Sequence, residues 1–272
     1  AGHPDAVLTG VWGRDPDKAA DLAATHGATG FADLDDLLDS VDAVVFAVPP
    51  DVQAEAAIRA ARAGRHLLLE KPVALSVAVA EEVGRAVDEA GVASVVFFTE
   101  RFVPEREAWL EERAAADSLG GHASWMASLR TPDNPFAGSI WRQEQGALWD
   151  VGPHALSVLI PVLGPVVDVA GARGVDDLVH LVLTHEGGTT STVSLSLTMP
   201  PDATRRAVEV YDAGGWHIRA EDTSNDAVAH QQRALCDLVA CIREGRTDHR
   251  VDVHFGIEVV RVLERAAQVL DE

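Results

Sequence analysis

Cysteine and basic residues are both scarce in this chain of 272 residues. It has two cysteines, Cys236 and Cys241, which we expect to be buried free thiols with no disulfide framework. Lys and Arg number 22 against 43 Asp and Glu, which gives a formal net charge of -21. Because nucleic acids are bound through clustered Lys and Arg, this deficit argues against a nucleic-acid partner.

Long apolar runs are lacking as well. The runs Val92 to Phe98 and Ala155 to Leu163 are well short of the roughly 20 residues that cross a bilayer, so no membrane span is expected. The N-terminus has no basic segment followed by an apolar one, which favours a cytoplasmic protein. Hydrophobic residues still make up 47% of the chain, enough for the cores of two domains.

The hydrophobic pattern changes once along the chain. From Val7 to Phe98, short apolar runs alternate with helical patterns, which is typical of βαβ units and a parallel sheet. Beyond about residue 120 the expected strands follow one another directly, and Thr190 to Leu197 alternates polar and apolar residues. The sequence therefore predicts an α/β fold, in which a parallel sheet is followed by an α+β domain with a mainly antiparallel sheet.

Three loops after the parallel strands carry informative residues. They contain Gly13-Arg14, Pro49-Pro50-Asp51 and Glu70-Lys71-Pro72. Ligands of an open parallel sheet bind beyond the carboxyl ends of its strands, so we expect the three loops to face one crevice.

Two separate segments resemble one enzyme family. Residues 63–72, A-G-R-H-L-L-L-E-K-P, resemble the A-G-K-H-V-x-x-E-K-P segment of the glucose-fructose oxidoreductase, inositol dehydrogenase and rhizopine-catabolism (Gfo/Idh/MocA) family. Trp141-Arg142 and the run from Gly146 to His154 are similar to its W-R and G-G-x-x-x-D-x-G-x-H, and Arg101-Phe102-x-Pro104 to its R-F-x-P. This resemblance implies a nicotinamide-dependent oxidoreductase that acts on a hydroxyl or carbonyl carbon of a sugar, cyclitol or similar small molecule.

The resemblance also implies roles for domains and residues. Residues 1–100 would form a Rossmann-like dinucleotide-binding domain, and residues 101–272 a substrate and oligomerisation domain whose last helix packs back on the first. The implied catalytic residues are Lys71, Asp150 and His154, with His154 as acid/base and Lys71 as an orienting group that also relays the proton. The implied cofactor-binding residues are Gly13, Arg14, Val48, Pro49, Glu70, Lys71, Pro72, Arg101, Trp141 and Arg142.

Two features of the proposed site remain open in the sequence. Asp150 and His154 share a helix face only if the helix has begun by Asp150, and Pro153 fits comfortably only in a first turn. Gly13-Arg14 favours NADP over NAD, because an Arg at this position suits a ribose 2′-phosphate, whereas Asp15 reads as a helix cap. The spacing of the other histidines supports no metal site.

The sequence departs from the family pattern at its start. No G-x-G-x-x-G precedes the strand at 7–12, which aligns with the family's second strand, so a first βα unit of about 25 residues has no counterpart here. A non-catalytic binding or regulatory protein of the same fold is therefore the alternative to an enzyme, and cofactor-assisted glycoside hydrolysis is a third hypothesis. A homodimer or homotetramer through the C-terminal sheet is expected, with a merely solvated sheet face as the alternative.

Overall fold

A computed structural model describes residues 3–129, 138–219 and 226–271. The first half of the chain contains short strands and their connecting helices: β1 (Gly10–Trp12), α1 (Pro16–Thr25), β2 (Thr29–Phe31), α2 (Leu34–Asp39), β3 (Ala43–Val45), α3 (Pro50–Arg62), β4 (His66–Leu69), α4 (Val77–Ala90) and β5 (Ser94–Val96). The second half contains η1 (Thr99–Phe102), α5 (Pro104–Ala114), β6 (Gly120–Met126), α6 (Ile140–Leu163), β7 (Val166–Arg173), β8 (Val179–His185), β9 (Thr190–Ser196), η2 (Pro201–Ala203), β10 (Arg205–Asp212), β11 (Gly215–Ile218), α7 (Ala227–Glu244) and α8 (Val253–Asp271).

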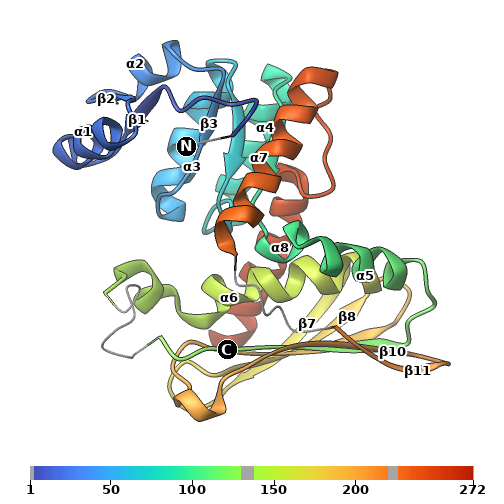
Figure 1. The fold of residues 1–272 in the computed structure, drawn as a ribbon. Coiled ribbons are helices and arrows are strands. Elements are labelled where there is room, and N and C mark those ends of the chain that lie inside the picture. Colours follow the sequence, from blue (N-terminus) through green and yellow to red (C-terminus); the bar gives the residue numbers. More distant parts are fainter. Residues whose placement is uncertain (1–2, 130–137, 220–225, 272) are drawn as a thin grey trace.

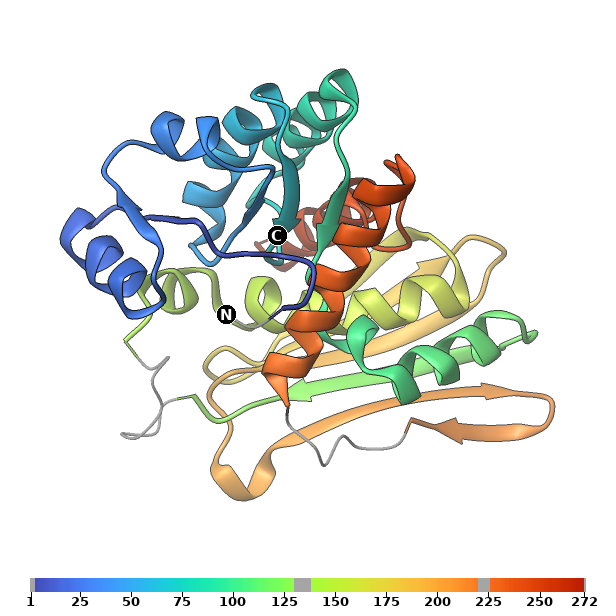
Figure 2. The ribbon, with the colours of Figure 1, turned by 45° about the horizontal axis from the view of Figure 1, so that its top comes forward.

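The strands of the first half are all parallel and form two sheets. β3, β4 and β5 make one three-stranded sheet, and β1 pairs with β2 in a second sheet. The described residues before Gly10 form no helix or strand, and this segment runs toward α7, where Asp5 pairs with Arg243 at 2.6 Å (Figure 2). Parallel strands bring the carboxyl ends of β3 and β4 to the same edge, beside the amino end of α3.

The second half is built on one six-stranded sheet. Its strand order is β11-β10-β6-β9-β8-β7, antiparallel throughout except for the parallel pair β6 and β9. Helix α6 contacts β6, β8 and β9, and α8 contacts both β7 and α4. Figure 1 shows these helices in a layer between the long sheet and the parallel strands, so the sheet has one covered face and one open face.

Helix α6 lies at the centre of the molecule. Its second part is almost wholly buried, and leucines such as Leu156 and Leu159 join the core that continues to Leu67 and Leu68 on β4. Its length and apolar composition also match those of a membrane span, but 83% of its most apolar window is buried inside the protein. We therefore read α6 as a core helix, as expected from the short apolar runs.

The predicted fold class is confirmed, with several local corrections. The apolar runs at 7–12, 42–48 and 92–98 each form a strand of only three residues, although the backbone N–H groups of Phe46 and Phe97 still donate to Leu68 and Leu69 of β4. The sequence reading missed β2, α2, α5 and β11, which are short or strongly charged. Both cysteines are free, but Cys236 is exposed on α7, so the expectation of a buried thiol was wrong there. Its sulfur lies 3.0 Å from Nε2 of His3.

Candidate active site

Three charged side chains meet beyond the carboxyl end of β4. The Nζ of Lys71 lies 3.0 Å from Oδ1 of Asp150 and donates to the Asp150 backbone carbonyl at 2.6 Å. The other carboxylate oxygen of Asp150 accepts from Nε of Arg142 at 3.0 Å. The side chains of Lys71 and Asp150 are only 11% and 7% exposed, so this is a buried ion pair braced by a second cation.

The turn that carries Lys71 is held by Gln53. The side chain of Gln53 on α3 is fully buried, and its Oε1 accepts from the Glu70 backbone N–H at 2.7 Å. Its Nε2 donates to the carbonyls of Glu70 and Pro72 at 2.8 and 3.2 Å. Gln53 thus satisfies backbone groups on both sides of Lys71, a role that the sequence pattern did not indicate. A buried amide opposite an irregular turn after a strand is the signal that would have found it.

A break in α6 sets the positions of Asp150 and His154. Gly146 interrupts the helix with φ 65° and ψ -164°, a conformation that glycine adopts without steric cost. A new helical segment then begins at Ala147, so Asp150 and His154 lie one turn apart on the same side. Pro153 is accommodated inside this segment, where it removes one helical donor.

His154 lies against the second domain's sheet. Its ring stacks on Trp125 of β6, with ring centroids 6.2 Å apart and planes 16° from parallel. Its Nδ1 is buried and has no hydrogen-bond partner in the described ranges. Burial, and then the positive charges of Lys71, Arg206 and Arg106, hold the pKa of His154 well below its usual range. The imidazole is therefore neutral at pH 7 and able to accept a proton.

Glu70 is a second residue near the site whose pKa is shifted. Burial raises the pKa of its carboxyl group, and the charges of Lys71 and Arg142 oppose that rise. Perturbed titrating groups beside a buried ion pair are typical of catalytic sites.

The loop after β1 presents an available cation. Arg14 is exposed and makes no hydrogen bond or ion pair with another described residue. Asp15 caps α1 by accepting from the Lys18 N–H at 3.2 Å and also pairs with the Lys18 ammonium, as expected for a helix cap. Gly13 stands beside Arg14, and a Cβ there would make only an ordinary van der Waals contact, 3.8 Å from the Ala19 side chain.

Other predicted residues are placed differently. Pro49 is the amino-terminal cap of α3 and supplies no side-chain hydrogen bond there, so the N–H groups of the first turn stay available near Val48. Trp141 is covered by the guanidinium of Arg142, which lies 4.9 Å from its ring centroid. Arg101 does not join the group. Its guanidinium is buried and bidentate to Glu107 at 2.7 and 2.9 Å, which leaves it committed to the contact between η1 and α5.

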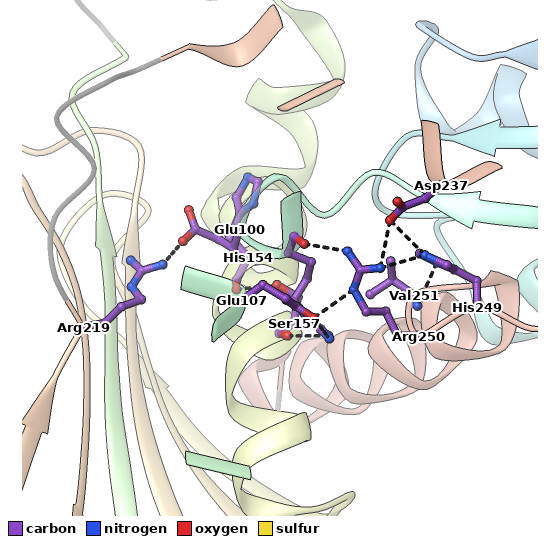
Figure 3. A network of polar contacts seen from close by, with 10 residues as sticks. Glu100, Glu107, His154, Ser157, Arg219, Asp237, His249, Arg250 and Val251 are labelled. Carbon is purple, nitrogen blue, oxygen red and sulfur yellow. Dashed lines mark hydrogen bonds and ion pairs between the residues drawn. The ribbon is translucent and has the colours of Figure 1, made fainter. Parts of the chain in front are cut away.

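A second polar cluster surrounds His154. Figure 3 shows the carboxylate of Glu100 beside His154 and paired with Arg219 from the end of β11. The other oxygen of Glu100 accepts from Arg106 at 2.8 Å. The same figure shows Arg250 paired with Glu107 and Asp237, each at 2.8 Å. These pairs join α5 to α7. Arg101 links Glu107 to the backbone carbonyl of Ser157, and the Ser157 hydroxyl group donates to the His154 carbonyl at 2.8 Å.

A cavity of about 160 Å³ opens next to His154. Its polar and aromatic lining comes from η1, α5, α6, the sheet and α7, and consists of Thr99, Glu100, Arg106, Trp125, His154, Arg206 and His230. Within the described ranges, no three His, Cys, Asp or Glu side chains converge as metal ligands.

The residues at the crevice fit a nicotinamide dinucleotide in part. Arg14 is a free cation at the end of β1, where the phosphate of a ribose is bound in sheets of this type. Lys71 and Asp150 supply polar groups at the carboxyl end of β4. Among the described residues, no glycine-rich turn joins a strand to a helix to receive a pyrophosphate.

Comparison with known proteins agrees with this arrangement. Residues 1–98 match the oxidoreductase family with an NAD-binding Rossmann fold, and residues 109–218 match the GFO/IDH/MocA C-terminal domain. The chain belongs to this family of NAD(P)-dependent oxidoreductases.

Individual relatives bear different names. The chain is 26% identical to 4-carboxy-2-hydroxymuconate-6-semialdehyde dehydrogenase of Sphingobium sp., over 88% of this chain and 83% of that protein. It is 27% identical to scyllo-inositol 2-dehydrogenase (NADP(+)) of Bacillus subtilis, over 67% of this chain and 60% of that protein. In fold it resembles the structure of UDP-N-acetylglucosamine 3-dehydrogenase from Acidithiobacillus ferrooxidans, with a TM-score of 0.80 at 22% identity, covering 97% and 90% of the two chains.

Proposed function

We propose that this protein transfers a hydride between a nicotinamide cofactor and a hydroxyl or carbonyl carbon of a sugar, cyclitol or similar small molecule. The observation that carries the proposal is the buried chain of contacts Lys71–Asp150–Arg142 beside a neutral His154. The names of relatives, among them an inositol dehydrogenase, support the substrate class.

The proposed chemistry follows from the charges of the side chains. Bound NAD(P) supplies or accepts the hydride. In the oxidative direction, neutral His154 takes the hydroxyl proton, and Lys71 donates a hydrogen bond that holds the substrate oxygen and relays the proton. Asp150 directs the Lys71 ammonium group, and Arg142 prevents the Asp150 carboxylate from turning away. In reduction the same groups return the proton.

NADP is the preferred cofactor, with NAD as the alternative. The exposed guanidinium of Arg14 has no partner among the described residues, and the neighbouring Asp15 is engaged as a helix cap. A carboxylate that accepts from ribose hydroxyls is what an NAD site at this position uses, whereas a free Arg suits a 2′-phosphate.

We further propose how the two domains and the subunits are arranged around this site. Residues 1–100 bind the dinucleotide, residues 101–272 bind the substrate, and subunits pair through the open face of the six-stranded sheet as a homodimer or homotetramer. Val182 is 47% exposed at the middle of β8 on that face, next to Thr192 of β9. A cytoplasmic location is consistent with a small-molecule oxidoreductase.

The decisive experiment is a titration of NADPH and NADH followed by nicotinamide fluorescence, together with a screen of sugars and cyclitols for oxidation. Saturable binding of one cofactor, and turnover that is lost in Lys71→Met, support the proposal. Absence of saturable binding of both cofactors contradicts it and favours the non-catalytic binding protein of the same fold. A non-catalytic protein would not need Lys71, Asp150 and Arg142 to stay in contact. For that reason we prefer the enzyme hypothesis to the binding-protein hypothesis.

A further inference from the structure

The cavity beside His154 is the best candidate for the place where the substrate is selected. It opens next to the residue to which the acid/base role is given, yet Lys71 and Asp150 are not among its lining residues. A molecule whose reacting carbon lies near Lys71 and His154 would therefore extend its remaining atoms into this space. The charge inside the cavity determines which substituents fit there.

The one carboxylate in the cavity wall is already neutralised. Glu100 is 3% exposed, with one oxygen on Arg106 and the other on Arg219. A buried carboxylate held by two guanidinium groups does not repel an approaching anion, because its charge is compensated at close range. The cavity wall formed by described residues therefore presents no free negative charge.

Arg206 is the cation that remains available. It lines the cavity and is exposed, and it makes no hydrogen bond or ion pair with any residue in the described part of the chain. Its charge reaches the site, since Arg206 and Arg106 both depress the pKa of His154. The protein has a net charge of -21, so an unpaired Arg beside the acid/base residue gives this place a local charge opposite in sign to that of the whole protein.

Strand pairing explains why Arg206 reaches the cavity. Arg206 on β10 lies directly opposite Trp125 on β6, and such pairs project to the same face of an antiparallel sheet. Trp125 stacks on His154, and Trp125, His154 and Arg206 all line the same cavity. The preceding residue, Arg205, projects to the other face and is paired with Glu209 at 2.8 Å.

We propose that Arg206 binds an anionic substituent of the substrate, a carboxylate or a phosphate, so that the natural substrate is an acidic or phosphorylated sugar-like molecule. This inference rests on the proposed function for the role of His154, and it narrows the substrate class of the same site. A guanidinium presents two parallel N–H donors to either kind of anion, and Arg206 has both to offer.

The test compares Arg206→Gln with Arg205→Gln, which removes the same charge from the opposite face of the same strand. Binding of D-glucose, D-galactose and D-mannose, and of the uronate and 6-phosphate of each, is measured by calorimetry at low ionic strength. We expect at least one acidic form to bind about tenfold or more tightly than its neutral parent, the effect of one charge-assisted hydrogen-bonded contact. This preference should disappear in Arg206→Gln and persist in Arg205→Gln, and the tighter of uronate and phosphate identifies the anion.

Two results overturn the inference. One is equal binding of neutral and acidic forms, or no binding of any acidic form. The other is a preference for the acidic form that survives in Arg206→Gln. A parallel NADPH titration separates this inference from the proposed function. If NADPH binds and neutral sugars are oxidised as well as acidic ones, the function stands and the role of Arg206 fails. If anions bind through Arg206 but no nicotinamide binds, the function fails while the anion site stands.

Discussion

The ammonium group of Lys71 contacts Asp150 twice, at the backbone carbonyl and at Oδ1, although the two residues are 79 positions apart in the sequence. This double contact joins the turn after β4 to the central helix α6. It fixes the direction of the Lys71 side chain, and Arg142 fixes the carboxylate in turn. The relationship makes a clear prediction for Lys71.

Replacing Lys71 with Met should lower kcat/KM for the oxidoreductase reaction by about 100-fold or more, because a positioned proton-transfer or orienting group contributes that much. Cofactor affinity, measured by fluorescence, should change much less. Lys18→Met is the matched control, since Lys18 is exposed on α1 and, among the residues that the structure describes, forms an ion pair with Asp15 alone. Activity within a few-fold of the wild type in Lys71→Met would show that Lys71 has no catalytic part.

The titration of His154 gives a second prediction. With its pKa depressed, His154 should remain neutral as the pH falls through about 6.5, the value expected for an unfolded histidine. The contribution of the neutral form to stability is present above that pH and is lost as the pH falls toward the folded-state pKa. Proton NMR of the His154 ring, assigned by its disappearance in His154→Gln, should show a midpoint below 6.5. A midpoint at or above that value would rule out the neutral base.

Gln53 should be a positioning residue for the Lys71 turn. Gln53→Leu leaves the Glu70 N–H and two carbonyls without their buried partner, which should lower the free energy of unfolding by about 1–3 kcal/mol. Chemical denaturation measures this loss, and Gln232→Leu on the exposed side of α7 is the control. Because the turn carries Lys71, kcat should fall more than KM rises. Equal stability of the two variants would mean that the turn holds without Gln53.

Arg14 should determine the cofactor preference. Arg14→Ala is expected to weaken NADPH binding about tenfold or more while leaving NADH binding nearly unchanged, because only NADPH carries the 2′-phosphate. Fluorescence titration of both cofactors gives the ratio. Arg85→Ala, an exposed arginine on α4, controls for the loss of one positive charge. An equal loss of affinity for both cofactors would assign Arg14 a general electrostatic role instead.

The open face of the six-stranded sheet should mediate assembly. Val182→Glu places a charge at the middle of this face and should convert the assembly to monomers, as seen by sedimentation velocity at micromolar concentration. Val79→Glu on α4 introduces the same charge at a comparably exposed valine outside the sheet and should have no effect. A wild-type chain that sediments as a monomer would refute the proposed interface.

The sequence by itself determined the fold class and supplied the candidate residues for the site. The hydrophobic period changes after Phe98, and this change can be read from the local sequence. A strand covered on both faces is apolar throughout, whereas a strand exposed on one face alternates polar and apolar residues. The E-K-P and D-V-G-P-H segments indicate Lys71, Asp150 and His154 as candidate residues, and the structure brings Lys71 and Asp150 into direct contact.

Only the tertiary structure decided which side chains are free to act. Arg101 and Arg14 look alike in the sequence, but Arg101 is bound by Glu107 across a helix junction, whereas Arg14 has no described partner. Arg205 and Arg206 are adjacent, yet strand alternation sends one to Glu209 and the other to the cavity beside His154. Gln53 holds a turn 17 or more residues away. Such roles depend on contacts between distant segments, and the local sequence pattern carries no information about which partner each side chain will find.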